Sequence, residues 1–154
     1  MVTRLERLSH AAQIVSAIAV VVSIVYLAEQ IRSNTRAVNY EASRGLKELQ
    51  FQIDQWDQDS SHVAMMMRGD SDPASLSAVE WAQYARRSAN RHSVWAMAHT
   101  GLLEGTLRQT EWEGWDRSYS DGACLPGRLQ FWVERRQWYS GEFQSHVDSV
   151  VEQC

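Results

Sequence analysis

The sequence predicts an all-α protein: an N-terminal transmembrane helix that continues into a long amphipathic helix, packed with a small helical bundle. Three observations lead to this prediction. Residues 11–28 form an apolar segment without a charge, most of the remaining apolar side chains recur at three- and four-residue steps, and no stretch alternates with the period of a strand. With 44% hydrophobic and 22% charged residues, the chain has ordinary globular composition.

The apolar segment, AAQIVSAIAVVVSIVYLA, follows a short basic flank at residues 1–10. As a helix it would extend ~27 Å, close to the ~30 Å of a hydrocarbon core. Tyr26 suits the membrane interface. A cleaved signal peptide is the first alternative, but bulky Tyr26 occupies the −3 position of a cleavage after Ala28. A buried core helix is the second alternative. Of the three possibilities, we expect an uncleaved single-pass anchor in the cell inner membrane.

The orientation of this anchor follows from its basic neighbours. Arg4 and Arg7 precede the segment, whereas Arg32, Arg36, Arg44 and Lys47 follow it. By the positive-inside rule this count favours, narrowly, a cytoplasmic C-terminal domain.

Two cysteines, Cys124 and Cys154, are too few for a disulfide scaffold and match no zinc motif. In the cytoplasm we expect both to be free thiols. A bridge between them would tether the C-terminal tail, and it would require an oxidising compartment.

Small and weakly polar residues recur along one face of the apolar helix. Ser9, Ser16, Ser23 and Gln30 follow at seven-residue steps, with Ala12 and Ala19 between them. Such residues allow close helix packing in lipid. We therefore expect a helix-packing or partner interface at Ala12, Ser16, Ala19, Ser23 and Gln30. Chance use of Ala and Ser is one alternative, and a homo-oligomeric channel with a Ser-lined pore is another.

Residues 29–58 form the predicted amphipathic extension of a helix that runs from near Leu5 to Gln58. A helix of this length usually has a partner along its apolar face. That face carries Leu27, Ile31, Val38, Ala42, Leu46, Leu49, Ile53 and Trp56.

Residues 59–154 form the predicted bundle, and capping and stop signals place its helices. Asp59, Ser60 and Ser61 cap a short helix over 62–68 that Gly69 closes. Ser77 and Glu80 form a capping box for a long helix that stops at Gly105. Further helices begin at the capping box of Thr110 and Glu113, at Pro126 and after Ser140, and end near Tyr119, Tyr139 and Glu152 respectively.

Candidate chemistry in the bundle is sparse. His92 and His99 lie seven residues apart on one helix face, ~10 Å, too far to share one ion unaided. Glu142 and His146 are at most half of a metal site. We therefore expect no metal, no cofactor and no catalytic constellation, with the abundant tryptophans forming the core. The alternative is an enzyme or a metal- or ligand-binding bundle with a site among His92, His99, Glu104 and Cys124.

The net charge of −4, together with basic residues near the N-terminus, leaves the rest of the chain acidic, which argues against nucleic-acid binding. We expect a non-enzymatic membrane-anchored subunit or accessory protein. Its expected partners are the lipid bilayer and either copies of itself or a membrane-protein complex.

The segment IAVVVSIVYLAEQIRSNTRAV, Ile18 to Val38, resembles a group of uncharacterised bacterial membrane-anchored helical proteins. In that group a Val-rich helix runs into a Q-I-R-x-N-T-R string, whose polar members here are Gln30, Arg32, Asn34 and Arg36. The likeness continues at Gly101-Leu102-Leu103, in WEGW at 112–115 and in WVERRQWYSGEF at 132–143. Glu29 departs from the pattern by placing a charge beside the membrane. The resemblance implies fold and location and carries no activity.

Overall fold

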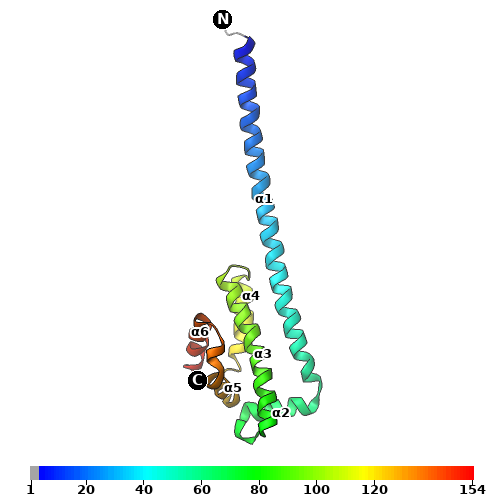
Figure 1. The fold of residues 1–154 in the computed structure, drawn as a ribbon, viewed down its shortest axis with the longest axis vertical. Helices are drawn as coiled ribbons and strands as arrows, with labels where there is room; N and C mark the ends of the chain where they lie inside the picture. Colours follow the sequence, from blue (N-terminus) through cyan, green and yellow to red (C-terminus); the bar gives the residue numbers. More distant parts are fainter. Residues whose placement is uncertain (1–3) are drawn as a thin grey trace. The chain divides into compact units, whose positions relative to one another are not determined.

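The computed structural model describes residues 4–154, apart from the side chains of residues 4–8, Ala11, Trp56 and Asp57. Every regular element among these residues is a helix, which confirms the all-α prediction (Figure 1). The chain divides into two compact units, one that ends at Val38 and one that comprises Asn39–Cys154. We call the second unit the helical domain.

Helix α1, Arg4–Asp54, is the long N-terminal helix, and its last residues belong to the helical domain. The helix expected to reach Gln58 ends four residues earlier, because Gln55–Gln58 tighten into the 3-10 turn η1. Such turns are frequent at helix ends. The basic flank expected at 1–10 lies largely outside the described side chains.

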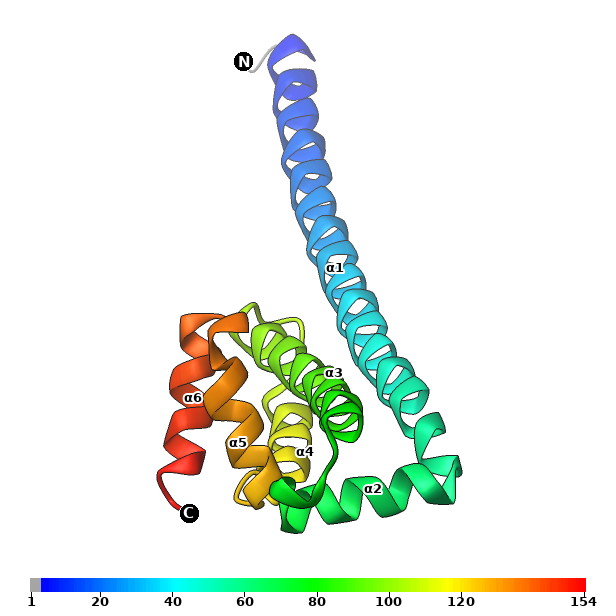
Figure 2. The same ribbon diagram turned by 60° about the horizontal axis from the view of Figure 1, so that its bottom comes forward.

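The rest of the helical domain is built around α3, which packs against α2, α4, α5 and α6 (Figure 2). Two further 3-10 turns, η2 (Pro73–Ser75) and η3 (Arg136–Trp138), connect α2 to α3 and α5 to α6. The α-helices are α2 (Ser60–Ser71), α3 (Ala78–Leu103), α4 (Gln109–Ser120), α5 (Pro126–Arg135) and α6 (Gly141–Val151).

Local signals set several helix ends as expected. The capping box of α3 is present, with the Ser77 hydroxyl accepting from the Glu80 N–H and the Glu80 carboxylate accepting from the Ser77 N–H. Asp59 caps α2 and Ser140 caps α6. Gly105, with φ of 72°, follows α3 in the left-handed conformation that glycine adopts at little cost.

Three further predicted boundaries are wrong. Gly69 does not close α2, which continues to Ser71. The glycine serves close packing inside the helix instead, because a Cβ there would clash with the Tyr84 ring. Thr110 caps nothing, since α4 begins earlier, after Arg108, whose side chain pairs with Glu111. The helix expected to reach Tyr139 ends at Arg135 and gives way to η3.

Three of the seven tryptophans lie in the core of the helical domain, as predicted, whereas Trp138 is 61% exposed. Trp95, Trp112 and Trp132 are buried with Phe143 and Val147. The indole N–H of Trp95 donates to Asp116 at 3.0 Å, and that of Trp132 donates to Asp148 at 2.8 Å. These bonds satisfy the polar atom that each large ring takes into the interior.

The apolar face of the amphipathic extension meets two environments. Leu46 and Ile53, near the end of α1, are buried in the domain core, so this part of the face packs within the chain itself. Ile31 and Val38, in the first unit, are 65% and 46% exposed. Leu49 of the helical domain is also 37% exposed, so the chain itself covers only part of this face.

Candidate functional site

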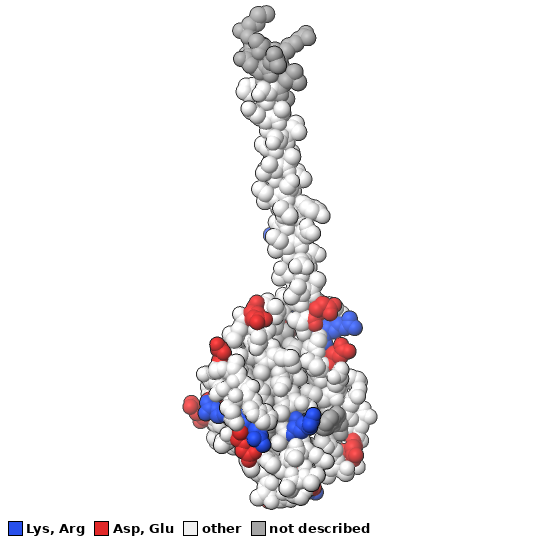
Figure 3. All heavy atoms as spheres, viewed as in Figure 1, with Lys and Arg blue, Asp and Glu red and all other residues white. Residues whose placement is uncertain are grey.

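The first candidate site is the exposed apolar part of α1. From Ala12 onward this helix is long and apolar enough to cross a membrane: its most apolar 18-residue window has a mean hydropathy of 2.1, and none of that window is buried. Large apolar side chains are mostly exposed, for example Ile14 at 61% and Val25 at 64% of its surface. The visible face of this part of α1 is almost wholly uncharged (Figure 3). A contiguous exposed apolar surface of this kind is typical of a site that contacts a membrane or another protein.

The predicted interface residues share one face of this helix. Successive helical residues are separated by about 100°, so steps of three, four and seven return to the same side. All five are exposed, and the Ser23 hydroxyl donates to the carbonyl oxygen of Ala19 at 2.8 Å. The Ser23 hydroxyl is thus satisfied within its own helix, and four of the five side chains on this face are small. The five residues are Ala12, Ser16, Ala19, Ser23 and Gln30.

The membrane-proximal polar motif separates into two faces of α1. Gln30 and Asn34 lie one helical turn apart on one side, and Arg32 and Arg36 lie one turn apart on the other. All four are exposed. Arg32 lies 3.9 Å from Glu29 in an exposed ion pair of small energetic value. The motif therefore offers an amide pair and a cationic pair instead of a single site.

The histidines of the alternative enzyme site do not form one site. His92 is buried beside Phe131 and Trp132, with Nδ1 2.8 Å from the Ser88 carbonyl oxygen. Burial, with the nearby positive charges of Arg128 and Arg91, lowers the pKa of His92 to about 4. His92 is therefore a neutral ring of the aromatic core.

His99 lies elsewhere, stacked on His146 with ring centroids 5.2 Å apart, and Nε2 of His146 lies 2.7 Å from Asp116. Burial, and then the neighbouring His146, lowers the pKa of His99. Glu104 is exposed at the end of α3. Among the residues with described side chains, no three potential metal ligands come together.

Cys124 and Cys154 form a disulfide, with their Cα atoms 5.4 Å apart. The prediction of free thiols is therefore wrong, and Cys124 is unavailable as a nucleophile. The two residues are 30 positions apart, and their meeting depends on how α5 and α6 return to the α4–α5 loop. The bridge tethers the C-terminal tail, in agreement with the alternative that the sequence allows.

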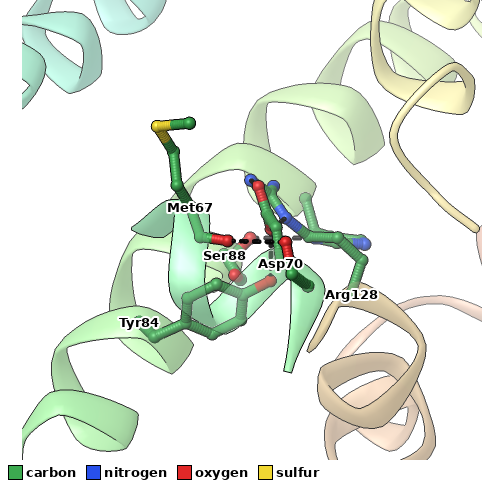
Figure 4. A network of polar contacts seen from close by, with 7 residues as sticks. Met67, Asp70, Tyr84, Ser88 and Arg128 are labelled. Carbon is green, nitrogen blue, oxygen red and sulfur yellow. Dashed lines mark hydrogen bonds and ion pairs between the residues drawn. The ribbon is translucent and has the colours of Figure 1, made fainter. Parts of the chain in front are cut away.

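A charged network that sequence reasoning missed connects α2, α3 and α5. Asp70 accepts from the Tyr84 hydroxyl at 2.6 Å and pairs with Arg128, whose Nε lies 2.8 Å away (Figure 4). Burial raises the pKa of Tyr84 above its usual range. Arg128 and Asp70 line two cavities together with Arg91.

The sequence holds a local signal only for the cavity wall beside this network. Arg87 and Arg91 are four residues apart on α3, which puts two guanidinium groups on one helix face. Asp70 and Arg128 are 58 residues apart, and no local pattern connects them.

Comparisons with known proteins add no identification: no family model matches the chain, and no curated protein or solved structure is significantly similar to it.

Proposed function

We propose that this chain is a non-enzymatic, single-pass subunit or accessory protein of the cell inner membrane, anchored by residues 11–28, that assembles through its long helix. The observation that carries the proposal is the solvent exposure of every described side chain from Ala12 to Val38. Burying such a helix in hydrocarbon removes its apolar surface from water and leaves no backbone group unsatisfied.

Assembly is proposed through the small-residue face at Ala12, Ser16, Ala19, Ser23 and Gln30. Helices in lipid associate by close packing over small side chains, since apolar surface there gains nothing by leaving lipid. The bond from Ser23 to Ala19 favours packing over a Ser-lined channel, because that hydroxyl already has its partner in the same helix. A homo-oligomer or a larger membrane complex would both use this face.

For the orientation we propose that the helical domain lies on the oxidising side of the membrane. The count of basic residues favours the cytoplasm by a narrow margin, but the disulfide between Cys124 and Cys154 argues for the opposite side. Structural disulfides persist in oxidising compartments and are rare in the cytosol. Arg4 and Arg7 would then be the cytoplasmic anchors. Trypsin added to spheroplasts should digest the domain, and a domain that stays intact until lysis would reverse the orientation.

The mass of the detergent-solubilised particle tests assembly. Ser16→Leu with Ser23→Leu places bulky side chains on the packing face and should lower the particle mass. Val21→Leu with Val25→Leu is the matched control, since both residues lie on the opposite side of the helix. If the serine variant keeps the wild-type mass, the proposed face is not an interface.

A further inference from the structure

Two partly open cavities lie next to each other inside the helical domain. One, of about 240 Å³, is walled by Trp95, Tyr119 and Leu125, and the other, of about 210 Å³, by Met66 and Arg87. The two cavities share part of their lining, because Asp70, Arg91 and Arg128 border both. Each is smaller than the pocket of a drug-sized ligand, so the space suits a small molecule.

Two of the three arginines beside these cavities have a carboxylate partner. Arg128 is held by Asp70 through Nε at 2.8 Å and Nη2 at 3.4 Å. Arg87, whose side chain is 2% exposed, lies 3.4 Å from Asp54.

Arg91 is the third arginine. It forms no ion pair among the described residues, although the negative charge of Asp54 acts on it. Its guanidinium lies over the Tyr119 ring, 5.0 Å from the centroid, and its buried Nε has no hydrogen-bond partner in the described part of the chain. Burial, and then the charges of Arg128 and Arg87, lowers the pKa of Arg91. Arg91 is therefore a partly desolvated cation with an unused buried hydrogen-bond donor, an arrangement that costs stability unless an anion completes it.

We propose that these cavities bind a small organic monocarboxylate, with its carboxylate on Arg91 and its apolar body against Trp95, Tyr119 and Leu125. A carboxylate would give the guanidinium of Arg91 the ion pair that it does not form within the described residues. The planar fork of a guanidinium donates two parallel hydrogen bonds to such a group. The aromatic and aliphatic wall favours an organic anion over an inorganic one, because only the former gains from leaving water there.

Calorimetric titration of the full-length protein in an uncharged detergent tests this proposal, with benzoate as the probe. Benzoate should bind once per chain, whereas neutral benzamide of the same shape should not. Arg91→Met keeps the side-chain stem and removes the charge, and it should weaken benzoate binding by about tenfold or more. Arg86→Met is the matched control, because Arg86 is exposed on the same helix, and it should bind benzoate as wild type does.

Three results would overturn the proposal. Benzoate failing to bind the wild type at millimolar concentration is one, and this readout requires no variant to fold. Equal binding by Arg91→Met and wild type is the second. The third is inorganic phosphate binding more tightly than benzoate, which would replace the carboxylate with another anion class. A separate readout distinguishes a structural role: without ligand, Arg91→Met should melt at or above the wild-type temperature, whereas a structural arginine would lower it when lost.

Discussion

Reduction of the Cys124–Cys154 disulfide should destabilise the helical domain by a predictable amount. The bridge joins the α4–α5 loop to the end of the chain across 30 residues. Closing a loop of that length in the unfolded chain removes conformational entropy worth about 3.6 kcal/mol at 25 °C. For a domain of this size, that loss corresponds to a melting temperature lower by about 10–20 °C.

Thermal unfolding followed by near-ultraviolet circular dichroism measures this loss, because the signal reports the packed tryptophans and not the anchor helix. The full-length protein is compared with and without a reductant, in the same detergent. Cys124→Ser with Cys154→Ser is the control, and it should melt with reduced wild type whether reductant is present or not. If the free energies of unfolding of the oxidised and the reduced protein differ by less than about 1 kcal/mol, the bridge does not constrain the domain and the reasoning fails.

Two further predictions concern the interior of the domain. The pKa of His92 is lowered from 6.5 to about 4, so the unfolded chain binds this proton more readily than the folded chain does. The free energy of unfolding, measured by urea titration, should therefore be unchanged above pH 6.5 and fall by about 3 kcal/mol as the pH drops to 4. His92→Phe should flatten this pH dependence. Gly127→Ala should cost about 3 kcal/mol, because the new Cβ would run into the carbonyl oxygen of Gly69. Gly114→Ala is its control, because Gly114 has open space around it in α4, and it should leave stability unchanged or slightly higher. Equal melting temperatures for the two variants would contradict the close approach of Gly127 to the Gly69 carbonyl oxygen.

Helices whose determinants are local could be predicted from the sequence. Apolar spacing and the capping box of Ser77 and Glu80 place α3 within a residue or two, and the charge-free segment before Glu29 places the exposed apolar stretch of α1. Gly69 shows where local reasoning fails. A glycine normally signals a helix end, but here α3 approaches so closely that glycine is needed inside α2. Tertiary packing overrides the local preference.

Contacts between distant segments account for the features that the sequence did not predict. The pairing of Cys124 with Cys154 depends on the path of two helices between them, and composition alone pointed to free thiols. Asp70 pairs with Arg128, and Arg91 lies beside the same cavities without an ion pair among the described residues. These relations are visible only once α2, α3 and α5 are placed together. Arginines look alike in a sequence, whether solvated or buried.

The membrane anchor is the central claim, and alkaline carbonate extraction of cell membranes tests it most directly. The full-length chain should remain in the membrane pellet after extraction, because a helix buried in hydrocarbon does not depend on the charge interactions that high pH disrupts. A chain that begins at Asn39, with the helical domain but without the apolar segment, should remain helical and appear in the soluble fraction. Recovery of the full-length chain in the soluble fraction would contradict the anchor and, with it, the assembly proposed through the same helix.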